Sequence, residues 1–210
     1  MQNQSEAALP TMAADDDEHA VAQPSGLAAL AIGASRHVAL LAAWVAMCGS
    51  LFFSDVLGWP PCLLCWYQRI CMYPLAAILA VGIVRRDRAV HAYVLPLALL
   101  GACISTYHYL LLKTRWLPAP PCAEGGVPCT VDYLHINGLP FVNIPFLALV
   151  AFIIIAVSML ISTADGGAAT DDDDAPRRAG RWQRPAAVAI IVLVVGATLV
   201  LAQLYRAANA

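Results

Sequence analysis

Five long apolar segments, separated by polar stretches, follow one another along this chain of 210 residues. Each reaches the roughly 20 residues that a helix needs to cross the hydrocarbon core of a bilayer. The segments are 38–57, 66–84, 92–112, 141–161 and 186–204. The chain is 60% hydrophobic and only 12% charged, which is unlike the balance of soluble domains. The pattern predicts an all-α, polytopic membrane protein with five spanning helices.

The basic residues predict how these helices are oriented. If the five helices alternate in direction, most of the twelve basic residues fall on one side of the membrane. They are Arg36, Arg85, Arg86, Arg88, Arg177, Arg178, Arg181 and Arg184. Cytoplasmic loops carry the excess of Lys and Arg, so this side is predicted to be the cytoplasm. The other side receives the loops 55–65 and 113–140 and the C-terminal tail.

The composition divides the chain into four parts. Residues 1–35 are rich in Ala and Asp without a periodic apolar face, and we expect a disordered cytoplasmic tail. Residues 36–162 hold the first four helices. Residues 163–184 are rich in Gly, Asp and Arg, which is typical of a solvated cytoplasmic linker. Residues 185–210 form an additional transmembrane helix with a short outer tail.

A C-x-x-C motif, Cys62 and Cys65, stands where a Pro-Pro pair ends and the second apolar segment begins. Proline suits the start of a helix, so Pro60 and Pro61 favour a helix whose first turn carries both cysteines. The helix dipole then favours a thiolate, the form of cysteine that disulfide exchange requires. Arg69, one turn beyond Cys65 on the same face, adds a positive charge.

A second cysteine pair, Cys122 and Cys129, lies in the outer loop 113–140. Gly125 and Gly126 let the backbone turn back, so these two cysteines can be bridged. Two pairs on one oxidising side of a membrane form a relay for two electrons: a thiolate opens the loop disulfide, and a released loop cysteine attacks the C-x-x-C disulfide. With no nucleotide or haem motif in the chain, a quinone in the bilayer is the expected acceptor.

The stretch C-L-L-C-W-Y-Q-R-I-C-M-Y-P, residues 62–74, resembles the DsbB family of disulfide bond formation proteins, in its short-loop, BdbC-like branch. The resemblance covers about residues 38–161. It implies a four-helix membrane bundle of DsbB type, to which the last helix of this chain is an addition. It also implies a quinone-dependent protein disulfide oxidoreductase of the bacterial inner membrane, with its redox cysteines on the extracytoplasmic side.

The resemblance assigns roles by position. Cys62 and Cys65 match the quinone-coupled pair, with Cys65 facing the quinone, which is ubiquinone or menaquinone, and Cys62 attacked by the loop. Cys122 resembles the cysteine that forms a mixed disulfide with a DsbA-like, thioredoxin-fold partner, and Cys129 the one that attacks Cys62. Arg69 and His108 match residues at the quinone. The loop pair is separated by only six residues, far fewer than in the enterobacterial form.

Other interpretations stay open. The four outer cysteines also fit a non-catalytic scaffold with structural disulfides or a four-thiolate zinc site. The vitamin K epoxide reductase-like family resembles this chemistry, but there the loop pair precedes the C-x-x-C. Arg69 also fits a snorkelling interfacial residue, and His108 a packing residue. Three further cysteines are expected to be packing residues and three aromatic residues to belong to the interfacial belt: Cys48, Cys71 and Cys103, and Trp66, Tyr67 and Tyr107.

Overall fold

Each apolar segment forms one long helix in the computed structural model of the chain, which describes residues 26–87, 89–114, 117–120, 126–134, 139–166 and 183–209. The helices are α1 (Gly26–Leu51), α2 (Leu63–Arg85), α3 (Val90–Lys113), α4 (Ile144–Gly166) and α5 (Gln183–Ala208). α1 continues into one π-helical turn, η1 (Phe52–Val56). Five stretches of 20 to 25 residues in these helices are long and apolar enough to cross a membrane. The predicted all-α, multi-pass architecture is confirmed.

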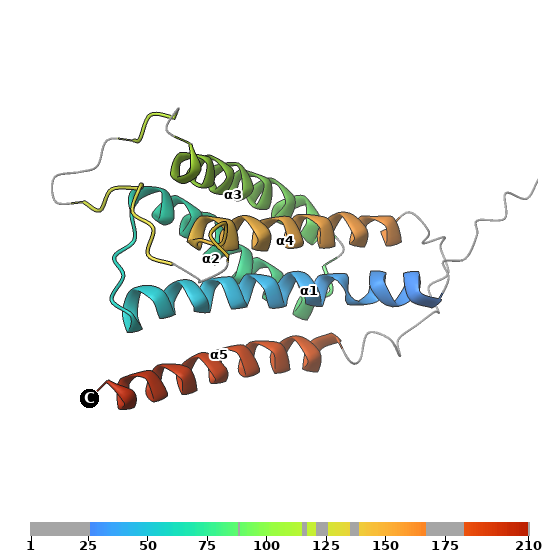
Figure 1. The fold of residues 1–210 in the computed structure, drawn as a ribbon. Coiled ribbons are helices and arrows are strands. Elements are labelled where there is room, and N and C mark those ends of the chain that lie inside the picture. Colours follow the sequence, from blue (N-terminus) through green and yellow to red (C-terminus); the bar gives the residue numbers. More distant parts are fainter. Residues whose placement is uncertain are drawn as a thin grey trace, which may run out of the picture.

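The first four helices pack around one core, and α5 lies along its outside, next to α1 (Figure 1). α1 and α3 each pack against both α2 and α4. All four helices contribute fully buried apolar side chains, among them Leu40, Leu75, Val94 and Phe152. At Gly101 of α3 any side chain would overlap the ring of Phe152, so this glycine lets α3 and α4 approach closely, as small residues do in membrane bundles.

The two ends of the bundle differ in charge. The α1–α2 and α3–α4 connections lie at one end, together with the C-terminus of α5 (Figure 1). The tight α2–α3 turn lies at the other end, where Arg36 donates a hydrogen bond to the carbonyl of Asp87 at 3.2 Å. Arg36, Arg85 and Arg86 therefore gather at one end, as the charge pattern predicts. α1 begins at Gly26, so residues 26–35 of the predicted tail are helical and not disordered. Residues 1–25 of that tail and most of the predicted linker lie outside the described residues.

α5 touches the bundle along only a narrow strip. Its contacts are with α1, α2 and η1. Ala187 and Ala202 are the buried residues among its described side chains, while large apolar residues such as Val192 and Leu193 are exposed. The rings of Tyr205 in α5 and Phe52 in η1 meet edge to face, with centroids 6.4 Å apart. In a bilayer, the exposed apolar side of such a helix faces lipid chains.

Candidate active site

Cys62 and Cys65 stand at the start of α2. Pro60 and Pro61 precede the helix, whose first residue is Leu63. Cys62 is the N-cap: its backbone is extended (φ −74°, ψ 174°), and its Sγ accepts a hydrogen bond from the backbone N–H of Cys65 at 3.4 Å. The first turn thus carries Cys65 as predicted, but Cys62 lies just before it, because its sulfur replaces the missing partner of an N-terminal N–H group.

The two sulfurs of the motif share one proton. Cys62 Sγ donates a hydrogen bond to Cys65 Sγ over 3.1 Å. This hydrogen bond, followed by burial, raises the pKa of Cys62 to about 12. The expected thiolate is therefore not on Cys62 in the reduced protein. Cys62 keeps its proton and directs it at Cys65, which favours the negative charge of the pair on Cys65.

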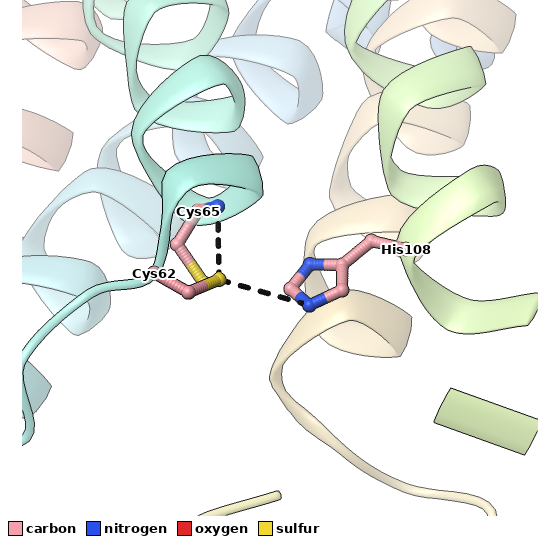
Figure 2. Close-up of side chains that lie close together, drawn as sticks. All are labelled: Cys62, Cys65 and His108. Carbon is pink, nitrogen blue, oxygen red and sulfur yellow. Dashed lines mark hydrogen bonds between the residues drawn. The ribbon is translucent and has the colours of Figure 1, made fainter. Parts of the chain in front are cut away.

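His108 of α3 lies against the Cys62 side of the motif (Figure 2). The residue is only 2% exposed. Its Nε2 atom is 3.8 Å from Cys62 Sγ and 3.1 Å from the backbone carbonyl oxygen of Cys129. Its Nδ1 atom is 3.3 Å from the amide nitrogen of Gln68 in α2. One imidazole thus contacts both cysteine-bearing segments that the sequence analysis singles out.

Cys129 is 1% exposed and packs with Cys62, Leu64 and Leu111 in a small apolar cluster at the start of α2. Burial raises the pKa of the Cys129 thiol, and contact with Cys62 raises it further, while the backbone N–H groups of Leu64 and Leu63 act in the opposite direction. Its sulfur therefore lies between the first N–H groups of α2 and the sulfur of Cys62. This is the geometry in which a thiolate at Cys129 reaches Cys62.

Cys65 faces a different environment, a cavity of about 390 Å³ between α1, α2 and α4. The wall is largely apolar, with residues such as Ala46, Leu147 and Ala151. Cys65 and Arg69 are among the residues that line it. His108, for which the resemblance implies a place at the quinone, is not a lining residue of this cavity, so that assignment stays a prediction.

Arg69 is held by two neighbours at the wall of this cavity. Its Nη2 donates a hydrogen bond to the carbonyl of Ser50 near the end of α1, at 3.0 Å. Its guanidinium carbon lies 5.4 Å from the centre of the Trp66 ring. The side chain is therefore ordered by α1 as well as by α2, which distinguishes it from a freely snorkelling arginine.

Three stacked aromatic rings form the part of the cavity wall nearest the loops. Phe53 of η1 stacks on Trp59 with centroids 5.4 Å apart, and Trp59 stacks on Tyr133 at 5.6 Å. Trp59 precedes the C-x-x-C, while Tyr133 follows Cys129 in the second loop. The stack connects the two cysteine-bearing segments, and the sequence pattern gives no sign of it, because the pairing joins residues far apart in the chain.

The structure confirms two of the three predicted packing cysteines. Cys48 and Cys71 are buried, as predicted for packing residues, but Cys103 is exposed on α3, so its prediction is wrong. Gln68, buried and in contact with His108, was missed. A lone amide in a membrane helix beside a C-x-x-C was the available signal for it, because polar groups inside a membrane are costly unless paired. Cys122 lies outside the described residues.

Cys62, Cys65 and His108 form a cluster of side chains of the kind that binds metal ions. The ligand atoms of Cys62, Cys65 and His108 lie within 4.8 Å of one another, and cysteine and histidine are the ligands that zinc prefers. Ligation requires a lone pair on the ring nitrogen nearest the sulfurs. That nitrogen, Nε2, instead faces the carbonyl of Cys129, to which it can only donate. The hydrogen bonds around His108 therefore do not favour a metal site.

The chain is similar in sequence to several proteins that are named for disulfide formation. The chain is 49% identical over 130 residues to the "Disulfide bond formation protein C" of Bacillus subtilis, which covers 60% of this chain and 92% of the relative. The "Probable disulfide formation protein C 1" of Bacillus anthracis gives the same identity and coverage. The "Probable disulfide formation protein C" of Halalkalibacterium halodurans is 50% identical over 121 residues, 58% of this chain and 87% of the relative.

No solved structure matches the chain. The family described as "Disulfide bond formation protein DsbB" matches residues 34–162. This match contains α2 and α3, the C-x-x-C, Arg69, His108 and both loop cysteines, and it ends before α5. The protein is therefore a disulfide bond formation protein and belongs to the DsbB family.

Proposed function

We propose that the protein is a membrane thiol oxidase that reoxidises a DsbA-like, thioredoxin-fold protein and passes the electrons to a membrane quinone. The observation that carries this proposal is that the two motif sulfurs have different surroundings. Cys65 lines the apolar cavity, while Cys62 adjoins Cys129 on the other side of the helix start. A dithiol with one sulfur toward each redox partner suits transfer of two electrons between a protein and a lipid-soluble acceptor.

The cavity suits a quinone ring in size and chemistry. Binding pockets for small molecules are mostly apolar with a few placed polar groups, and about 390 Å³ is within their usual range. Cys65 would supply the reacting sulfur, and Arg69 would supply a fixed positive charge at the cavity wall. When bound, a quinone accepts two electrons and two protons. The aromatic rings of Phe53, Trp59 and Tyr133 close the side toward the loops.

The relay begins at the loop pair. A thiolate of the partner attacks Cys122, forms a mixed disulfide and releases Cys129 as a thiolate. Cys129 attacks Cys62, the Cys62–Cys129 bond forms, and Cys65 leaves as a thiolate beside the cavity. The second partner thiol resolves the mixed disulfide, which oxidises the partner and frees Cys122.

Cys122 then attacks Cys129, which restores the loop disulfide and releases Cys62. The two electrons of the partner now reside in the Cys62–Cys65 dithiol. Loss of these two electrons and two protons to a quinone held in the cavity would restore the Cys62–Cys65 disulfide. The sum is one partner dithiol oxidised and one quinone reduced.

The orientation belongs to the same proposal: the protein lies in the bacterial inner membrane, with the cysteine-bearing end outside the cytoplasm. The gathering of Arg36, Arg85 and Arg86 at the opposite end supports it. Alkaline phosphatase fused after residue 113 is expected to be active, and the same fusion after residue 166 inactive. The reverse pattern would contradict the proposed orientation.

The function is tested by measuring quinone reduction and partner oxidation together. Cys62→Ser and Cys65→Ser are each expected to abolish quinone-dependent oxidation of a reduced thioredoxin-fold protein, because either change removes the central disulfide. Cys129→Ala is expected to accumulate a mixed disulfide with the partner through Cys122. Wild-type rates in either serine variant would discard the proposal, and trapping only through Cys129 in Cys122→Ala would reverse the loop roles.

A non-catalytic scaffold with structural disulfides or a zinc site would behave differently in the same preparation. A structural disulfide or a bound zinc does not respond to quinone. Titration of free thiols in the reduced protein, before and after addition of a soluble quinone, is expected to show loss of two thiols. One zinc per chain with no loss of thiols would favour the scaffold.

A further inference from the structure

His108 is buried between the two cysteine-bearing segments and away from the cavity. It comes from α3, whereas its contacts are Gln68 and Cys62 at the start of α2 and Cys129 in the second loop. Gln68 lines the cavity and its amide nitrogen contacts the imidazole, so this residue lies between the cavity and His108. The position of the ring is therefore suited to the exchange between sulfurs rather than to contact with a molecule in the cavity.

The hydrogen bonds at the two ring nitrogens select one tautomer of His108. The carbonyl oxygen of Cys129, 3.1 Å from Nε2, is an acceptor only, so Nε2 must carry the proton. A neutral imidazole then has a lone pair on Nδ1. The amide nitrogen of Gln68, 3.3 Å away, is a donor and matches that lone pair. The contacts at both ends of the ring agree on the neutral Nε2–H form.

The Nε2–H group has two consequences for the sulfurs. It fixes the backbone of Cys129, which keeps the Cys129 sulfur in the buried cluster with Cys62. It also lies 3.8 Å from Cys62 Sγ, where a donor stabilises negative charge that develops on this sulfur during exchange. Loss of the donor would remove both effects at once.

We infer that His108 is a positioning residue for disulfide exchange between Cys129 and Cys62, and that Gln68 holds it in the Nε2–H form. This inference rests on the proposed function, because it assigns His108 to one step of that relay. In this step the Cys129 thiolate attacks Cys62, the Cys62–Cys129 bond forms, and Cys65 leaves as a thiolate. With attacker and target exchanged, Cys62 attacks Cys129 and Cys122 leaves. Neither reaction involves net oxidation. His108 donates a hydrogen bond throughout and transfers no electron.

The exchange can be measured without partner or quinone in a Cys65→Ala background. The protein is prepared with its Cys122–Cys129 disulfide intact and Cys62 reduced. Cys62 attacks Cys129, the Cys62–Cys129 bond forms, and Cys122 leaves as a thiolate that a maleimide mass tag captures. The rate of tagging at Cys122, followed by mass spectrometry, reports the exchange, and a Cys62→Ser, Cys65→Ala chain gives the background rate.

Three substitutions at His108 separate its donor from its volume. The amide nitrogen of a glutamine reaches the place of Nε2, while that of an asparagine reaches only the place of Nδ1. His108→Leu and His108→Asn are expected to slow the exchange about tenfold or more, the usual effect of losing one well-placed hydrogen bond to a charged group. His108→Gln is expected to remain within about threefold of the unchanged residue.

Two outcomes of this exchange assay overturn the inference: exchange in His108→Leu at the unaltered rate, or His108→Gln as slow as His108→Leu. A second readout controls for folding. In a Cys122→Ser, Cys129→Ser background, dithiothreitol reduces the Cys62–Cys65 disulfide directly, and reduction of decylubiquinone follows only the cavity side. His108→Leu is expected to lose much less of this rate than of the Cys62–Cys129 exchange, because only the exchange also needs the backbone of Cys129 held in place. An equal loss in both assays would overturn the inference.

Failure of the proposed function looks different. A chain with His108 unchanged would then reduce no decylubiquinone with dithiothreitol, whereas the dependence of the Cys62–Cys129 exchange on His108 would persist. The two assays thus separate an error in the acceptor from an error in the role of His108.

Discussion

The two sides of the C-x-x-C differ in almost every physical respect, although their sulfurs are 3.1 Å apart. The Cys65 side is an apolar cavity with one fixed charge, Arg69. The Cys62 side is a closed contact in which His108, Gln68 and Cys129 satisfy one another. A single helix start thus places one sulfur at an apolar cavity and the other against a cysteine of the second loop.

The difference follows from where each cysteine stands on α2. Cys62 is the N-cap, so its sulfur lies at the end of the helix, beside the loop that carries Cys129. Cys65 is one turn inside, where it lines the cavity between α1, α2 and α4. A change on one side should therefore alter one half-reaction more than the other.

The largest effect is expected on the cavity side, at Arg69. Arg69→Met removes the charge that contacts the cavity, and we expect quinone reduction driven by dithiothreitol to fall roughly 10- to 100-fold, since hydrogen bonds to charged groups are worth this much. The exchange between Cys62 and Cys129 should change far less. Arg85→Met, which removes an exposed charge from the other end of the same helix, is the matched control. Similar losses in both variants would contradict a specific role for Arg69.

The next effect concerns the proton that the two sulfurs share. Cys65→Ala removes the acceptor of the Cys62 thiol, so the pKa of Cys62 should fall from about 12 toward the ordinary range. More of Cys62 is then thiolate at pH 8, and alkylation by iodoacetamide should become about tenfold faster or more. Mass spectrometry of the reduced protein measures the rate at Cys62. Cys103→Ala, at an exposed cysteine of α3, should leave it unchanged.

A smaller effect is expected at Trp59, whose change should disturb both sides. Its ring lies between Phe53 at the cavity and Tyr133 in the loop of Cys129. Trp59→Leu removes both stacking contacts and should slow each half-reaction roughly threefold to tenfold, the usual value of such pairs. Tyr67→Leu removes a ring from the exposed side of α2 and serves as the control. An effect of Trp59→Leu on one assay alone would show that the stack does not join the two sides.

The smallest effect is expected at Gln68. Gln68→Met keeps the length of the side chain but removes the donor to Nδ1, so the other tautomer of His108 becomes competitive and the exchange should slow about threefold. The Cys122 tagging assay measures it. In a His108→Leu background the same substitution should have no further effect, because the two residues act through one contact. Additive losses would place Gln68 in a separate role.

The helices were predictable because the bilayer imposes a length and an apolar composition on every span. Those two quantities can be read from the sequence, and the five predicted segments agree with the structure to within a few residues. The start of α2 was predictable from Pro60 and Pro61 for the same local reason. The exact place of Cys62 was not, because a sulfur that caps the helix is uncommon and depends on its rotamer.

The inner and outer faces of a membrane helix cannot be told apart by polarity alone. Both are apolar, which is why the prediction for Cys103 fails while those for Cys48 and Cys71 succeed. The contact of Gln68 with His108 and that of Trp59 with Tyr133 join segments far apart in the chain. They follow from how the helices pack, and no local pattern encodes them.

The narrow contact of α5 has a consequence for the surroundings of α1. Along this strip, side chains of the same polypeptide occupy positions that annular lipids would otherwise fill. The edge-to-face pair of Tyr205 and Phe52 is part of this strip, and the ring of Phe52 also contacts that of Phe53. Since α5 cannot diffuse away as a lipid does, the solvation of this flank stays the same when the acyl chain composition of the bilayer changes.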